Sequence, residues 1–110
     1  MNIHKNILNK ICENKFDDFE SLLNNKDLNL CKKSETNILM ECINHDRLKF
    51  FENMINFKKN HIYYFNFSIV LKKIIQKEYY NYIKIILNIK NINFYLSFDI
   101  FLNLFIELGK

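Results

Sequence analysis

The chain has 110 residues, of which 49% are apolar and 25% charged, so it is long enough for one globular domain of modest stability. Its single glycine excludes most of the glycine-rich loops that bring backbone close to a phosphate. The net charge of +4 divides unevenly, because residues 1–56 carry eight Lys/Arg against nine Asp/Glu (−1) and residues 57–110 carry eight Lys against three acids (+5).

The cysteines and the lengths of the apolar runs indicate the cellular compartment. Cys12, Cys31 and Cys42 are odd in number and show no C-x-x-C spacing. We expect no secretory leader, because residues 1–13 are polar at every second or third position. Lys or Asn interrupts every apolar run before the roughly 18 residues that a membrane span needs. We therefore expect reduced thiols and a soluble, intracellular protein in the cytoplasm, with no membrane partner.

The first part of the chain has the pattern of a helix pair. Residues 2–13 place apolar side chains at helical spacing, and Asn14 then interrupts the pattern. A second helix is expected over roughly 15–24, with two aspartates in its first turn, where the helix dipole favours negative charge. The polar residues 25–36 lack periodicity and indicate a surface loop.

This pattern recurs after 32 residues and again after 64. The superposed positions are Ile7, Leu39 and Leu71; Ile11, Ile43 and Ile75; Phe16, Leu48 and Tyr80; Phe19, Phe51 and Ile83; Leu22, Met54 and Ile86; Leu23, Ile55 and Leu87; and finally Asn24, Asn56 and Asn88. A period near 33 built of paired helices indicates a repeat array in which each unit buries its apolar face against its neighbours. The units are expected over about 2–28, 29–60, 61–90 and, incomplete, 91–110.

The register also predicts which side chains form the core. Leu39 and Phe51 are expected inside, so replacing either by alanine should cost about 2 to 5 kcal/mol. Phe50 serves as the control, because its replacement should destabilise the fold less than that of Phe51.

Short motifs in the second unit resemble a known repeat family. Asp27-Leu28-Asn29, followed eight residues after Asn29 by Asn37-Ile38-Leu39-Met40, resembles the D-V-N and T-P-L-H segments of ankyrin repeats. The run 48–55 stands where that family has L-E-I-V-K-L-L-L. Ankyrin repeats have a glycine between their two helices, and at that position the three successive units of this chain have Asn14, Asp46 and Glu78. That glycine accommodates a left-handed backbone, which Asn and Asp tolerate better than Glu, so we expect strain or a rearrangement near Glu78.

The second half departs further from the family. As an isolated sequence, residues 61–67 alternate like a strand, but the register, which fixes Leu71 independently, favours a loop and a third helix pair. A fourth unit is expected to start at 91–93 and to stop without its outer helix. Because the final helix is apolar nearly all round, we expect either a longer array or self-association through residues 95–110, with a fold-back cap as the alternative.

The sequence contains no catalytic or metal-binding motif. His45 and Asp46 are adjacent, and adjacent helical residues do not face each other, so a general base with an orienting carboxylate is not indicated. No two of the three histidines and three cysteines stand at a metal-ligand spacing on one element. We therefore expect no enzyme, no metal and no cofactor.

Together these patterns predict an all-α domain, a short α-solenoid of about three and a half helix-loop-helix repeats. The ankyrin resemblance implies a scaffold that binds another protein through its finger loops and concave inner-helix face. The positions carried over from the family are Lys33, Ser34, Thr36, Asn44, His45, Phe65, Asn66, Ser68, Gln76 and Lys77. An intracellular adaptor fits this resemblance, in the host cytoplasm if the source is viral or parasitic.

Two alternatives remain open. Aromatic residues 63–67 lie among lysines, a combination that single-stranded nucleic-acid sites use, although burial of one set of rings explains the alternation more simply. The second alternative is a structural part of a larger repeat protein that binds nothing alone.

Overall fold

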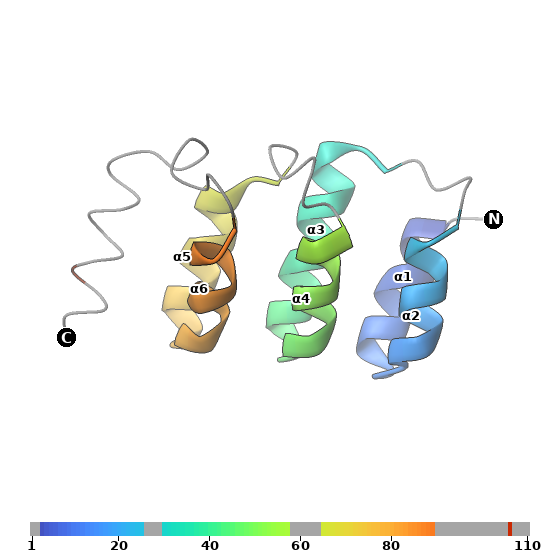
Figure 1. Cartoon of the computed structure of the whole chain (residues 1–110), viewed down its shortest axis with the longest axis horizontal. Coiled ribbons are helices and arrows are strands. Elements are labelled where there is room, and N and C mark those ends of the chain that lie inside the picture. The colour runs from blue at the N-terminus through green and yellow to red at the C-terminus, as the bar shows by residue number, and fades with distance from the viewer. Residues whose placement is uncertain (1–2, 26–29, 58–64, 90–105, 107–110) are drawn as a thin grey trace. The chain divides into compact units, whose positions relative to one another are not determined.

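The computed structural model describes residues 3–25, 30–57, 65–89 and 106 (Figure 1). These residues form six helices and no strand, which confirms the all-α prediction for the described part of the chain. The helices are α1 (Ile3–Cys12), α2 (Phe16–Leu23), α3 (Lys32–Asn44), α4 (Leu48–Phe57), α5 (Phe67–Lys77) and α6 (Tyr80–Leu87). The chain divides into two compact units, Met1–Asn66 and Phe67–Lys110.

The first unit consists of two helical hairpins that lie side by side, α1 with α2 and α3 with α4 (Figure 1). The first helices of the two hairpins pack against each other, α1 on α3, and so do the second helices, α2 on α4. The core between them is formed by Ile7, Ile11, Phe19, Leu23, Ile38, Leu39, Cys42, Ile43, Phe50, Phe51, Met54 and Ile55. Burial of each large side chain of this kind contributes about 1.5–3 kcal/mol.

The second unit contains the hairpin of α5 and α6, which pack on each other. Its buried residues are Phe67, Val70, Leu71 and Ile74 on α5 and Tyr82, Ile83 and Ile86 on α6. Leu87 departs from the repeat, because it is 42% exposed while its equivalents Leu23 and Ile55 are buried.

All three hairpins turn through the same backbone motif. Asn14, Asp46 and Glu78 have positive φ angles of 60°, 52° and 60°. The amides of these residues donate to the carbonyls three residues earlier, at 3.1–3.2 Å, and the amides that follow them donate to the carbonyls five residues earlier, at 2.7–3.1 Å. This pair of bonds is the Schellman helix ending, with the left-handed residue directly after the C-cap. The predicted left-handed backbone is confirmed, and Glu78 adopts it without a rearrangement of the turn.

The start of the third helix differs from the prediction. Residues 25–36 were expected to be a loop, but α3 begins at Lys32. Cys31 is its extended N-cap residue, the amide of Glu35 donates to the carbonyl of Cys31 at 3.0 Å, and Glu35 supplies the acidic side chain of the first turn. The loop prediction is therefore wrong over 32–36, because a polar first turn has no apolar periodicity to reveal it.

Phe50 is also placed differently from the prediction. It is buried like Phe51, because its ring lies between the second helices of the two hairpins, 5.2 Å from the ring of Phe16 and 4.9 Å from that of Phe19. The 32-residue register is right for Phe51, but the partner of Phe50 comes from the neighbouring hairpin. Phe50 therefore cannot serve as the exposed control.

No helix in the part of the chain that the structure describes combines the length and the apolarity needed to cross a bilayer.

Candidate functional site

The ten predicted contact residues differ in their exposure. Lys33, Asn44, His45, Asn66 and Gln76 are exposed, and Ser34, Ser68 and Lys77 are partly buried. Thr36 and Phe65 are buried, so the expectation that these two positions stay open to a partner is wrong. The hydroxyl of Thr36 instead accepts a hydrogen bond from the amide of Asn66 at 3.0 Å, which ties the segment before α5 to α3.

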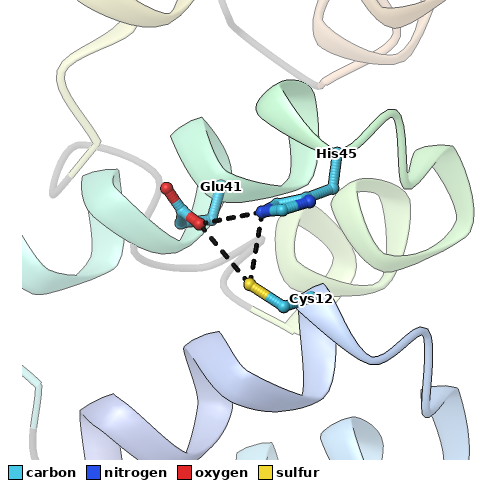
Figure 2. Close-up of side chains that lie close together, drawn as sticks. All are labelled: Cys12, Glu41 and His45. Atoms are coloured by element: carbon cyan, nitrogen blue, oxygen red, sulfur yellow. Dashed lines mark hydrogen bonds and ion pairs between the residues drawn. The ribbon is translucent and has the colours of Figure 1, made fainter.

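Two of these residues, Asn44 and His45, belong to a polar cluster at the adjoining ends of α1 and α3. Figure 2 shows its centre, where the side chains of Cys12, Glu41 and His45 point toward one another. Nε2 of His45 lies 3.2 Å from Sγ of Cys12 and 3.3 Å from Oε2 of Glu41, and Sγ lies 4.0 Å from that same oxygen. The cluster therefore brings together a thiol, a carboxylate and an imidazole, three groups that can bind a metal ion, from two hairpins.

The repeat geometry explains why these residues meet. Cys12 is the last residue of α1, and the 32-residue register places it at the level of Asn44, the last residue of α3. Glu41 and His45 are four residues apart, so their side chains lie on one face of the helix end. Because α1 packs beside α3, that face meets Cys12.

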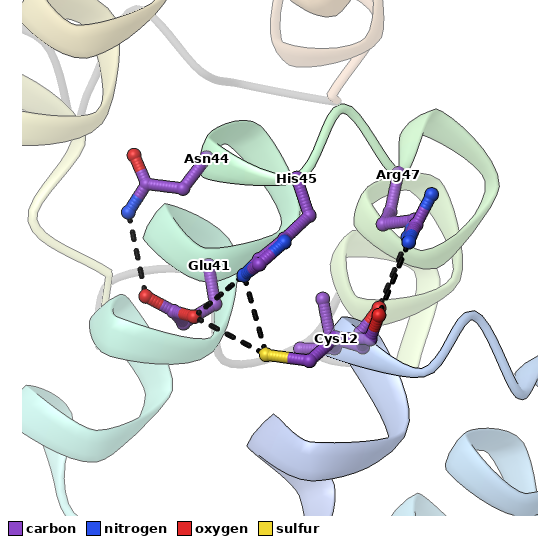
Figure 3. A network of polar contacts seen from close by, with 6 residues as sticks. Cys12, Glu41, Asn44, His45 and Arg47 are labelled. Atoms are coloured by element: carbon purple, nitrogen blue, oxygen red, sulfur yellow. Dashed lines mark hydrogen bonds and ion pairs between the residues drawn. The ribbon is translucent and has the colours of Figure 1, made fainter.

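Two neighbouring residues hold the cluster in place (Figure 3). Nδ2 of Asn44 donates to Oε1 of Glu41 at 3.3 Å, which leaves Oε2 directed at the thiol and the imidazole. Arg47 donates from Nε to the carbonyl of Ile11 at 3.0 Å and from Nη2 to the carbonyl of Cys12 at 3.2 Å. The carbonyl of Ile11 also accepts the amide of Asn14, so the guanidinium adds a second bond there, and its charge is favourable at the C-terminal end of a helix.

The geometry differs from that of a thiol nucleophile with its base. In such a relay one imidazole nitrogen faces the nucleophile and the other faces the orienting carboxylate. Here Nε2 of His45 faces both Cys12 and Glu41. The groups are also open to solvent, since Cys12 is exposed and the side chains of Glu41 and His45 are 31% and 37% exposed.

The three thiols occupy different environments. All three are free, with Cys12 and Cys31 exposed and Cys42 buried. Burial raises the pKa of the Cys42 thiol far above its ordinary value. The hydroxyl of Ser34, 3.2 Å from Sγ of Cys31, stabilises the thiolate and lowers the pKa of Cys31. Cys42 is thus a core residue, whereas Cys12 and Cys31 are the thiols that a reagent or a ligand can reach.

The prediction from sequence did not identify Cys12, Glu41 or Arg47. A metal-ligand spacing is recognised within one helix or loop. This cluster instead forms between two helices that are 32 residues apart in the repeat register. The signal present in the sequence was the combination of that register with the Glu41 and His45 pair at i and i+4.

No family model, no curated protein and no solved structure matches this chain.

Proposed function

We propose that this chain is an ankyrin-like repeat module that binds another protein through its finger loops and through exposed side chains of the first helix of each hairpin, α1, α3 and α5, and that it catalyses no reaction. The observation that carries the proposal is the recurrence of one helix ending, with a left-handed residue, at Asn14, Asp46 and Glu78. A chain that repeats one hairpin buries each unit against its neighbours and leaves the polar side of the array free for a partner. An intracellular scaffold role follows from the same proposal, and the exposed free thiols support it.

The exposed residues of α3 support this surface. Lys33, Asn37 and Asn44 on α3 and His45 at its C-cap are all exposed, and α3 packs against both α1 and α4. These side chains are held by a rigid element, and rigid presentation lowers the entropic cost of binding. The tips of the predicted finger loops, at 26–29 and 58–64, lie outside the described residues.

The nucleic-acid alternative receives less support. Phe65 and Phe67, two of the aromatic residues it would use for stacking, are buried. Tyr63 and Tyr64, the other two aromatic residues of that cluster, lie outside the described residues.

Self-association through residues 95–110 stays a prediction. Of that segment the structure describes Ile106, whose side chain is 53% exposed. Light scattering over a range of dilutions tests it. A monomer at every concentration, with no binding of a dye specific for exposed apolar surface, would contradict it.

The test of the proposed function compares two fourfold alanine variants of the full chain for binding to a partner captured from lysate and then purified. The inner variant changes Lys33, Asn44, His45 and Gln76. The outer control changes exposed residues of the second helices, namely Asp18, Glu52, Asn81 and Lys84. With native circular dichroism for both, the inner variant should lose binding and the outer variant should keep it. Retained affinity in the inner variant would remove this surface from consideration.

A further inference from the structure

We propose that Cys12, Glu41 and His45 bind a Zn²⁺ ion, with Sγ, Oε2 and Nε2 as its three protein ligands. These atoms all lie within 4.8 Å of one another and come from two different helices (Figure 2). The metal site shares His45 and Asn44 with the proposed partner-binding surface, but metal binding is measured without a partner, so failure of one proposal is distinguishable from failure of the other.

The separations between the ligand atoms fit a tetrahedral zinc ion. Zn–S distances are about 2.3 Å, and Zn–N and Zn–O distances are about 2.0–2.1 Å. In tetrahedral geometry these bond lengths place neighbouring ligand atoms roughly 3.3–3.6 Å apart. The observed separations are 3.2 Å for Sγ to Nε2, 3.3 Å for Nε2 to Oε2 and 4.0 Å for Sγ to Oε2. The first separation lies just below this range and the third lies above it, so the Cys12 side chain, which takes part in both, has to adjust when the ion binds.

Without a metal, both donors of this cluster share one acceptor, because the thiol of Cys12 and Nε2 of His45 both face Oε2 of Glu41. On a neutral imidazole, Nε2 is either a donor or an acceptor. It cannot donate to the carboxylate of Glu41 and at the same time accept from the thiol of Cys12, although both lie within 3.3 Å of it. A cation at the common point satisfies all three groups together. On binding, the Sγ–H bond of Cys12 breaks, a Zn–S bond forms, and the proton goes to solvent.

The donor set selects the metal. A thiolate and an imidazole favour Zn²⁺ over the hard cations Mg²⁺ and Ca²⁺, which take oxygen ligands. Asn44 holds the distal oxygen of Glu41, and Arg47 fixes the end of α1, so the ligands have the supporting contacts that metal sites use (Figure 3). Three protein ligands leave the fourth coordination position of a tetrahedral zinc ion for a water molecule. Water can reach this position because the side chains of the cluster are partly exposed.

The first test is a titration of the untagged, reduced full chain with Co²⁺, followed by displacement with Zn²⁺. We expect one equivalent of Co²⁺ to give a thiolate-to-cobalt charge-transfer band and tetrahedral visible bands, both lost when Zn²⁺ is added. Absence of the charge-transfer band at stoichiometric protein would overturn the proposal.

Variants then assign the ligands. Cys12→Ser and His45→Gln should each weaken Zn²⁺ binding by more than about 100-fold, because even supporting contacts are worth about 10–100-fold. Asn44→Ala should weaken it by about tenfold. Cys31→Ser is the matched control, since Cys31 is also exposed and contacts Ser34 rather than the cluster. Equal affinity in Cys12→Ser, or a loss in Cys31→Ser, would contradict the assignment, and circular dichroism verifies that each variant is folded.

Discussion

The guanidinium of Arg47 caps the end of helix α1 by donating from Nη2 to the carbonyl oxygen of Cys12 at 3.2 Å, while its Nε binds the preceding carbonyl. Arg47 is itself the residue after the left-handed Asp46 in the second turn. One hairpin therefore completes the helix ending of its neighbour, and this contact fixes how the two hairpins of the first unit stack.

Arg47→Ala should lower the free energy of unfolding by about 1–3 kcal/mol, because two hydrogen bonds from a charged group to carbonyls at the end of α1 are lost. Arg47→Lys should recover less than half of that loss, since an ammonium lacks the planar fork. Urea unfolding measures both. Glu52→Ala, an exposed change on the same hairpin, is the control and should stay within about 0.5 kcal/mol of the parent. An unchanged midpoint in Arg47→Ala would contradict the capping role.

Glu78→Gly should stabilise the protein by about 0.5–1 kcal/mol. A non-glycine residue in the left-handed region costs roughly 1–2 kcal/mol, and the greater freedom of glycine in the unfolded chain offsets part of the relief. Asn14→Gly should change stability less, because asparagine tolerates this backbone. Thermal unfolding compares the two variants. Destabilisation by Glu78→Gly would show that the Glu78 side chain contributes more than its backbone strain costs.

Phe50→Ala and Phe51→Ala should each cost about 3–5 kcal/mol in urea unfolding, as Phe→Ala changes in packed cores do. Phe57→Ala supplies the matched control, since Phe57 ends the same helix and is 38% exposed. We expect it to cost less than half as much. A small effect at Phe50 would mean that the contact between α2 and α4 contributes little to the first unit.

The thiols should differ in reactivity. Iodoacetamide should modify Cys12 and Cys31 in the native protein and Cys42 only on unfolding, because Cys42 is buried and its pKa is raised by burial. The pKa of Cys31 is lowered by the hydroxyl of Ser34, so Ser34→Ala should shift the rise in the Cys31 alkylation rate to higher pH. Mass spectrometry across a pH series measures this. If the pH dependence of the Cys31 alkylation rate is unchanged in Ser34→Ala, the Ser34 hydroxyl is not the cause of the lowered pKa of Cys31.

The sequence predicted the elements that the 32-residue register controls. It placed the left-handed turns at Asn14, Asp46 and Glu78, and it placed Leu39 and Phe51 in the core. These features follow from local pattern, since a helix ending and an apolar stripe are encoded within one hairpin.

What was missed depends on contacts between hairpins. The ring of Phe50 is covered by Phe16 and Phe19 of the preceding hairpin, so periodicity within α4 does not reveal its burial. The cluster of Cys12 with His45 likewise forms only when α1 and α3 pack together. The early start of α3 was missed for a different reason, because its first turn is polar.

Site-specific photocrosslinking tests the proposed partner-binding function most directly. A benzophenone amino acid is placed at Asn44 and, separately, at its repeat equivalent Gln76, both exposed on inner helices. The matched controls are Glu52 and its equivalent Lys84, both exposed on outer helices. We expect Asn44 and Gln76 to crosslink one and the same protein and the control positions not to crosslink it. Crosslinks from Glu52 and Lys84 alone, or equal crosslinks from all four positions, would contradict the proposed function.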